Sequence, residues 1–361
     1  MRVLVTGAGG YIGGRLVPVL LSRGHEVVAS FSTGAPRGHR SWLDRVRVVG
    51  MDVLDETQVR AVVRDVDAVV YLVHALADRD FATRDRRGAE AVAAASAAAG
   101  VGRIVYLSGL VPGVAESSLS AHIASRLEVE RILAASGVPT ITARAAVVVG
   151  SGSTSFEIVR QVSERLPVRA LPPWSSTQVQ PIAVVDVLAA LAGCLEVAAE
   201  TRAFDVGGPE RLSYAALLRA YADVARLVRP QVPLLMPRAT VVSDAWADHW
   251  TGRLTGRITG VPPQTVSALV KSLRHDMVCG DDAFTAELLP HGHRLLGVRE
   301  SIERALTRPR AGVRPAERDP MGPLPGDPAW AGGDVYLFDG EARHRPQGAV
   351  RRVLLGVRRP W

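Results

Sequence analysis

The chain has 361 residues, of which 47% are hydrophobic, and its 43 basic and 36 acidic side chains give a net charge of +7. This composition excludes a disordered chain, and the length suffices for one large domain or two ordinary ones with a sizeable core. The two cysteines, Cys194 and Cys279, are too few for a disulfide scaffold, which favours a reducing compartment.

From residue 1 to about residue 150, short β-branched runs alternate with alanine-rich helical patterns. The runs are apolar on both faces, as in a parallel sheet covered by helices. Gly24, Gly100 and Gly137 follow three of the helical patterns, where a glycine commonly ends a helix. The expected strands are Val3–Val5, His25–Ala29, Val46–Val49, Ala68–Val73, Arg103–Leu107 and Pro139–Ala143, and the expected helices are Arg15–Ser22, Thr57–Arg64, Arg84–Ala99 and Ala124–Ala135. The predicted fold class is α/β, a Rossmann-type doubly wound parallel sheet with a small C-terminal substrate lobe.

The remaining chain divides into two ranges by composition. Residues 151–306 mix short strands with helical patterns and are expected to hold the remainder of the fold and the substrate lobe, packed on the carboxyl edge of the sheet. Residues 307–361 are rich in proline and arginine, which predicts a linker and a poorly packed tail. Within that tail, Asp334–Phe338 has the pattern of a single strand.

The amino terminus carries the strongest functional signal. A strand is followed at once by glycines and a helix, with the spacing Gly7-x-x-Gly10-x-x-Gly13 in place of the G-x-G-x-x-G fingerprint. Gly7 permits the tight turn, Gly10 lets the backbone approach a pyrophosphate, and Gly13 lets the helix lie against the strand. The N–H groups at the start of the helix would then face the phosphates. Residues 1–150 are therefore expected to be a nucleotide-binding core.

This turn, with Thr6 before it, resembles the turn of the short-chain dehydrogenase/reductase superfamily, in particular of its extended and atypical branches. Gln180–Val187 and Asp205–Pro209 resemble segments of the NmrA-like and complex I 39-kDa-subunit-like members. The resemblance covers roughly residues 1–305. Pro323–Gly333 resembles the start of a START-like region (DUF2867) that follows this fold in some bacterial relatives, and that region would be truncated here.

The resemblance implies an NAD(P)H site and a role for particular residues. An acidic residue in Met51–Asp55 would contact the adenine, and the fourth strand would run past the adenosine. The residues expected at the cofactor are Thr6, Gly7, Gly10, Tyr11, Ile12, Gly13, Ser32, Arg37, Asp52, Val53, Val73 and His74.

The end of the second expected strand bears on the choice of cofactor. NAD-preferring sites place an acidic residue there for the ribose 2′-hydroxyl, whereas an arginine accommodates a 2′-phosphate. Ala29–Gly34 has no acidic residue, and Arg37 and Arg40 follow it. NADP(H) is therefore expected rather than NAD(H).

The Tyr-x-x-x-Lys pair with which the superfamily moves protons is missing. No tyrosine lies between Tyr106 and Tyr214, and Lys271 is the only lysine of the chain. The slot of the pair holds His122 and Arg126 instead.

Three interpretations of this site stay open. In the first, His122 is the acid or base, Ser108 polarises a carbonyl and Arg126 holds the nicotinamide ribose. In the second, the cofactor and water suffice and the protein only orients the substrate. In the third, the protein binds the dinucleotide without catalysis, and His122 is a solvated histidine at a helix start.

Other patterns predict no further chemistry. The charged run Asp80–Arg87 is expected to be a solvated helix face with local ion pairs. The histidines and Cys279 in residues 275–293 have spacings that fit no structural metal site, so no metal is expected. No run of about 18 apolar residues occurs, and the tail arginines have no aromatic platform or reader motif, so neither a membrane span nor a nucleic-acid partner is expected.

The predicted function is that of an atypical NAD(P)H-dependent oxidoreductase with a small-molecule substrate. Its substrate pocket is expected between Ser108, His122, Ala145–Ser151 and the region around Trp174. The alternative is a non-catalytic dinucleotide-binding protein, either a redox sensor or an accessory subunit of a larger complex. A protein partner or a homodimer is compatible with both. Met1–Thr6 lacks the layout of a signal peptide, so a cytoplasmic protein is expected.

Overall fold

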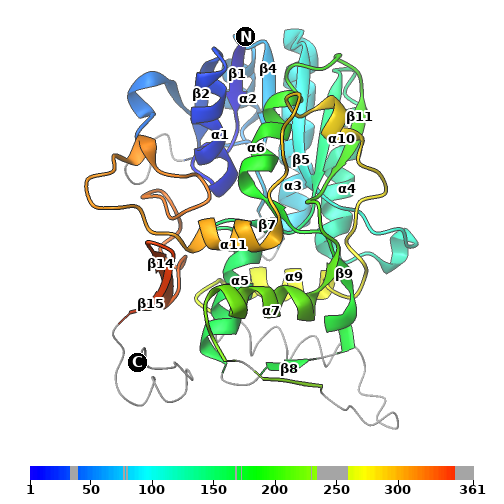
Figure 1. Ribbon diagram of the computed structural model, residues 1–361. Coiled ribbons are helices and arrows are strands. Elements are labelled where there is room, and N and C mark those ends of the chain that lie inside the picture. Colours follow the sequence, from blue (N-terminus) through cyan, green and yellow to red (C-terminus); the bar gives the residue numbers. More distant parts are fainter. Residues whose placement is uncertain are drawn as a thin grey trace. The chain divides into compact units, whose positions relative to one another are not determined.

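The computed structural model describes residues 1–32, 40–75, 78, 80–166, 169–171, 173–228, 230–233 and 259–345. The chain divides into two compact units (Figure 1). The first comprises Met1–Ala146, Val184–Gly207 and Cys279–Leu295, and the second comprises Val147–Ala183, Gly208–Val278 and the chain from Leu296 onward. The units are thus interleaved along the sequence, and the linear division expected at residues 150 and 306 stays a prediction.

A seven-stranded parallel sheet forms the centre of the first unit. Its order is β11-β6-β5-β4-β1-β2-β3. The strands are β1 (Arg2–Val5), β2 (Glu26–Phe31), β3 (Arg47–Gly50), β4 (Ala68–Tyr71), β5 (Arg103–Gly109), β6 (Thr140–Ala145) and β11 (Arg202–Val206). The central strands β1 and β4 are almost wholly buried, as runs that are apolar on both faces predict. The expected α/β class and Rossmann-type sheet are confirmed.

Helices cover this sheet (Figure 1). The helices α2 (Glu56–Val63), α3 (Phe81–Ala99) and α4 (Ala121–Ala134) pack side by side and share one apolar core with strands of the sheet. A second group contains α1 (Tyr11–Ser22) and α6 (Val184–Gly193), which pack on each other. The unit also contains η1 (Leu43–Arg45), η2 (Glu116–Ser118) and α10 (Ala283–Glu287). Gly24, Gly100 and Gly137 all have positive φ angles just after helices, as predicted.

The strand order places the candidate site. β1 lies between β4 and β2, so successive strands extend the sheet in opposite directions from this point. In sheets of this kind, ligands bind outside the carboxyl ends of the strands where the order reverses.

The second unit has its own apolar core. Phe156, Tyr221 and Ile302 are each at most 1% exposed and belong to one cluster. The helices are α5 (Thr154–Arg165), α7 (Tyr214–Val224), α9 (Pro263–Ser272) and α11 (Val298–Leu306), with η3 (Pro173–Ser176) and η4 (Pro315–Glu317). The short strands are β7 (Val148–Val149), β8 (Arg169–Leu171), β9 (Gln178–Val179), β10 (Ile182–Ala183), β12 (Leu212–Ser213), β13 (Gln231–Pro233), β14 (Val335–Phe338) and β15 (Glu341–His344).

The expectation of a poorly packed tail is wrong at Met321 and in β14 (Val335–Phe338). The strand expected at Asp334–Phe338 is present as β14, and it pairs antiparallel with β15. Val335 and Leu337 are buried in the core of the second unit, and Met321, elsewhere in the tail, is also buried. The high proline and arginine content suggested poor packing, but a few apolar residues at alternating positions are enough to anchor a strand. Residues 346–361 lie outside the described part of the chain.

The tail is bound to α5 by buried polar side chains, here called the α5 cluster: Glu157, Arg160, Glu164 and Tyr221. Arg160 donates to the carbonyl of Val335 at 2.7 Å, and Glu157 accepts the N–H of Gly332 at 2.9 Å. Glu164 accepts the hydroxyl of Tyr221 at 2.5 Å. All four side chains are at most 5% exposed.

No helix among the described residues is long and apolar enough to span a membrane.

Candidate cofactor and catalytic site

The glycine turn after β1 is shaped by close backbone contacts. Gly7 has a φ of 67°, which favours glycine. A Cβ on Gly13 would lie 2.4 Å from the carbonyl oxygen of Gly7 and 2.8 Å from Cα of Ala8. The first turn of α1 can therefore lie against the loop only because residue 13 has no side chain.

The start of α1 suits an anion. Its N-cap is Gly10, which provides no side-chain hydrogen bond, and its first turn has no acidic residue. The backbone N–H groups and the positive end of the helix dipole therefore favour a phosphate here.

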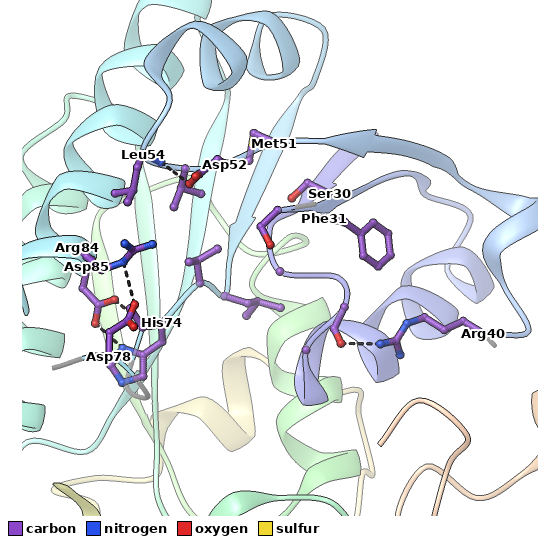
Figure 2. A pocket seen from close by; sticks show the side chains of 18 residues that line it. Ser30, Phe31, Arg40, Met51, Asp52, Leu54, His74, Asp78, Arg84 and Asp85 are labelled. Atoms are coloured by element: carbon purple, nitrogen blue, oxygen red, sulfur yellow. Dashed lines mark hydrogen bonds and ion pairs between the residues drawn. The ribbon is translucent and has the colours of Figure 1, made fainter. Parts of the chain in front are cut away.

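A cavity of about 530 Å³ begins at this turn (Figure 2). This volume is within the usual range for a small-molecule or cofactor site. It extends along the ends of β2 and β4, the loop after β3, and the start of α3. Its lining residues are Gly7, Gly9, Gly10, Ser30, Phe31, Ser32, Arg40, Met51, Asp52, Val53, Leu54, Leu72, Val73, His74, Ala75, Asp78, Arg84 and Asp85.

Seven of the residues expected at the cofactor line this cavity: Gly7, Gly10, Ser32, Asp52, Val53, Val73 and His74. Thr6 lies behind it, where its hydroxyl donates to the carbonyl of Val70 at 3.2 Å and accepts the N–H of Leu72 at 3.0 Å, which ties β1 to β4. Tyr11, Ile12 and Gly13 belong to α1 and are not among the lining residues. Arg37 lies outside the described residues.

Arg40 closes the side of the cavity next to the glycine turn. Its Nη2 donates to the carbonyl oxygen of Gly9 at 2.6 Å. The neighbouring Trp42 is 4% exposed and donates from Nε1 to the carbonyl oxygen of Gly14 at 2.9 Å. The segment after β2 thus holds the turn in place and brings a guanidinium to the cavity wall (Figure 2).

The three expected catalytic residues lie outside the cavity lining formed by the described residues. Ser108, at the end of β5, is 3% exposed, and no described group lies in hydrogen-bonding geometry to its hydroxyl. Burial raises the pKa of the nearby Tyr106 phenol, and Arg126 and Ser108 partly offset this rise. Arg126 donates to the carbonyl oxygen of Leu107 at 2.9 Å. His122 is 8% exposed, so its interpretation as a solvated histidine is wrong.

His122 is connected to the cavity through His74. Nε2 of His74 is 3.3 Å from Nδ1 of His122, and Nδ1 of His74 is hydrogen-bonded to Oδ2 of Asp85. We call His74, Asp85 and His122 the histidine cluster. Burial, reinforced by the Arg126 guanidinium, lowers the pKa of His74 despite Asp85. Burial, Arg126 and His74 lower the pKa of His122 well below its usual value.

Comparison with known proteins gives the family. The model of a family described as NAD(P)H-binding matches residues 7–190. The chain belongs to this NAD(P)H-binding family. A protein of Mycobacterium tuberculosis (strain ATCC 25618 / H37Rv), described as uncharacterized, is 28% identical over 241 residues, which cover 66% of this chain and 24% of that protein. The matched part of this chain thus spans about a quarter of that relative's length. A dTDP-4-dehydro-6-deoxy-D-allose reductase of Streptomyces bikiniensis is 40% identical over 75 residues, 19% of this chain and 23% of that protein.

Solved structures share the fold. The protein gox2253 superposes with a TM-score of 0.62 at 21% identity, covering 83% of this chain and 95% of that one. A UDP-glucose 4-epimerase of Thermus thermophilus, in complex with NAD, gives 0.53 at 21% identity, covering 76% of this chain and 99% of that one. The NAD-dependent NDP-hexosamine 5,6-dehydratase TunA gives 0.57 at 16% identity, covering 84% and 95%. This NAD(P)H-binding protein therefore shares its α/β Rossmann fold with these structures.

Sequence reasoning missed Asp85. The charged run at the start of α3 was expected to be solvated, which is wrong for Asp85, whose exposure is 4%. The signal was present in the helical period, because Asp85 falls on the face of α3 that also carries Gly88, Ala89 and Val92, all buried. The expected substrate pocket stays a prediction, and the side chain of Trp174 lies outside the described ones.

Proposed function

We propose that the protein is an NADP(H)-dependent oxidoreductase that interconverts a carbonyl and a hydroxyl group of a small molecule. One observation supports this above all: a single cavity joins the glycine turn to His74 and Asp85. A cradle for a dinucleotide and a side chain able to exchange a proton are the two parts that such a reaction needs. The nicotinamide, when bound, supplies or accepts the hydride.

The residues fit a dinucleotide. The glycine turn has no room for a Cβ at residue 13, and the uncapped start of α1 would bind the diphosphate through backbone N–H groups. Asp52 and Val53 would contact the adenine. Ser108 would polarise the carbonyl, and Arg126 would hold the nicotinamide ribose.

The preference for NADP(H) is supported by charge. The described end of β2 presents Ser30, Phe31 and Ser32 to the cavity, without a carboxylate for a ribose 2′-hydroxyl. Arg40 lines the same cavity, and an arginine there favours a 2′-phosphate.

Calorimetric titration with NADPH and NADH tests the preference. We expect NADPH to bind more tightly, and Arg40→Gln to weaken NADPH binding by about tenfold or more through the loss of one charge-assisted contact. NADH affinity should fall less, because NADH loses only the support that Arg40 gives to the glycine turn. Arg45→Gln, at an exposed position in the same segment, should leave both affinities unchanged. Tighter binding of NADH by the wild type would overturn the preference.

A non-catalytic sensor or accessory subunit is the second candidate, supported by the missing Tyr-x-x-x-Lys pair. The loss of NADPH absorbance over time, measured with quinones, flavins and small carbonyls as substrates, distinguishes the oxidoreductase from the sensor or accessory subunit. Turnover supports the oxidoreductase, whereas tight binding without turnover and a co-purifying partner support the second candidate.

A further inference from the structure

The imidazole of His74 lines the cavity and is fixed by a carboxylate (Figure 2). Its Nδ1 is hydrogen-bonded to Oδ2 of Asp85, and Oδ1 of Asp85 accepts the N–H of Ala75 at 2.8 Å. Both oxygens of Asp85 therefore bind the loop that carries His74. Because a carboxylate only accepts hydrogen bonds, Nδ1 of His74 carries a hydrogen and Nε2 is the nitrogen that can take up a proton.

His122 is the neighbour of that nitrogen. Its Nδ1 lies 3.3 Å from Nε2 of His74, and the centroids of the two rings are 5.1 Å apart. The distance allows a hydrogen bond in which either imidazole is the donor. A proton bound at Nε2 of His74 would thus be held by Asp85 at the opposite nitrogen and by His122 on its own side.

The charged groups around His74 come from α3, α4 and the loop between β4 and α3. Asp85 of α3 is negative, and Arg126 of α4 is positive and helps burial to lower the pKa of both imidazoles. The ion pair between Arg84 and Asp78, with an N–O distance of 3.0 Å, is half-exposed and lies on the same cavity wall. Near neutral pH the imidazoles are therefore neutral, and the ring of His74 lines the cavity.

We propose that His74 is the catalytic acid and base of this site, with Asp85 and His122 as its positioning residues, in place of the missing Tyr-x-x-x-Lys pair. This inference rests on the proposed function. When a hydroxyl is oxidised, its O–H would replace His122 as the partner of Nε2 of His74 and pass its proton to that nitrogen, while the C–H hydrogen would leave with both electrons of its bond to the bound dinucleotide. When a carbonyl is reduced, the carbon receives that hydride and Nε2 returns the proton to the oxygen. Asp85 keeps its hydrogen bond to Nδ1 of His74 in both directions.

Four variants test this assignment: His74→Gln, Asp85→Asn, His122→Gln and, as a control, His291→Gln, which changes an exposed histidine of the same unit. NADPH affinity is measured by calorimetry, and kcat is measured with phenanthrenequinone as the probe carbonyl. We expect His74→Gln to lower kcat by about 10²–10⁴-fold, the usual contribution of a general acid or base. His122→Gln should lower kcat less and displace its pH profile. NADPH affinity should stay within about threefold in His122→Gln and His291→Gln, whose side chains are not among the lining residues of the cavity.

Nitrogen NMR of the His74 ring gives a readout that needs no turnover. We expect the hydrogen on Nδ1 in the wild type and its redistribution toward Nε2 in Asp85→Asn, because the amide can donate to Nδ1. Unchanged kcat in His74→Gln, or a wild-type ring with its hydrogen on Nε2, would overturn the assignment. If the probe is not turned over, the NMR result decides. Failure of the wild type to bind NADPH would instead refute the proposed function.

Discussion

Each unit contains a buried polar cluster, and the two clusters differ in what surrounds them. The α5 cluster is closed, because its carboxylates and guanidinium bind the backbone of the tail at Gly332, Asp334 and Val335. The histidine cluster is open on one side, because His74 and Asp85 line a cavity of about 530 Å³. Both clusters carry the desolvation cost of burial, but only the histidine cluster presents its groups to a ligand.

This difference in surroundings indicates a structural role for the α5 cluster and a catalytic role for the histidine cluster. A buried charge whose hydrogen bonds are supplied by the chain itself stabilises one arrangement and has nothing left for a substrate. A buried imidazole that retains a proton-accepting nitrogen beside a cavity is suited to catalysis. Changes in the α5 cluster should therefore affect unfolding, and changes in the histidine cluster should affect turnover.

The largest effect on unfolding is expected for Arg160→Met. The substitution leaves Glu157 and Glu164 buried without their cation, a loss that typically costs about 3–5 kcal/mol. Denaturant unfolding measures this cost, and calorimetry should give an unchanged NADPH affinity. The matched control is Arg314→Met, which breaks an exposed ion pair with Glu317 and should cost much less, because solvent screens that pair. Equal costs in the two variants would contradict a structural role of the α5 cluster.

Gly333→Ala should have a smaller effect of the same kind. A Cβ at this position would lie 2.2 Å from Oε2 of Glu164 and 2.6 Å from Nε of Arg160, so the side chains or the tail must move. Overpacking of this kind typically costs about 1–3 kcal/mol of unfolding free energy. At Gly113 a Cβ would meet nothing within 4 Å, so Gly113→Ala should be nearly neutral. If thermal unfolding shows the same loss of stability in Gly333→Ala and Gly113→Ala, the tail is held less tightly than its contacts indicate.

The smallest effect is expected in the dependence of stability on pH. The folded protein lowers the pKa of His74 and of His122, so the unfolded chain binds more protons below about pH 6.5. Stability from these groups is present above that pH and is lost as the pH falls through their folded pKa values. The double variant His74→Gln and His122→Gln should show a shallower fall in unfolding free energy between about pH 7 and pH 5. His291→Gln should keep the wild-type slope, and an identical slope in the double variant would rule out this contribution.

Local patterns were sufficient to predict the sheet and the glycine turn. The strand before Gly7, the helix after Gly10 and the glycines that end α3 and α4 are all determined by neighbours in sequence. Ser32, Asp52 and His74 line the cavity because strand ends in a parallel sheet meet at one edge. Asp52 and His74 were expected there from the resemblance to the short-chain dehydrogenase/reductase superfamily.

Contacts between distant residues could not be predicted in the same way. The helical period places Asp85 on the buried face of α3, but its partners His74 and Ala75 come from the loop after β4. The packing of the tail was not predicted either, because it depends on contacts such as that of Val335 with Arg160, which lie 175 residues apart in the sequence. Composition carries no information on such a contact.

The interleaving of the two units also affects how the chain is synthesised. The ribosome completes β1 at Val5, but β11 emerges only after Arg202, so β6 remains an open edge of the sheet while the intervening residues are made. An unpaired strand edge is a template for association with another chain, and pairings across such separations form slowly. The nascent chain therefore has an aggregation-sensitive interval between the emergence of β6 and that of β11, in which slower translation or a bound chaperone alters the yield of native protein.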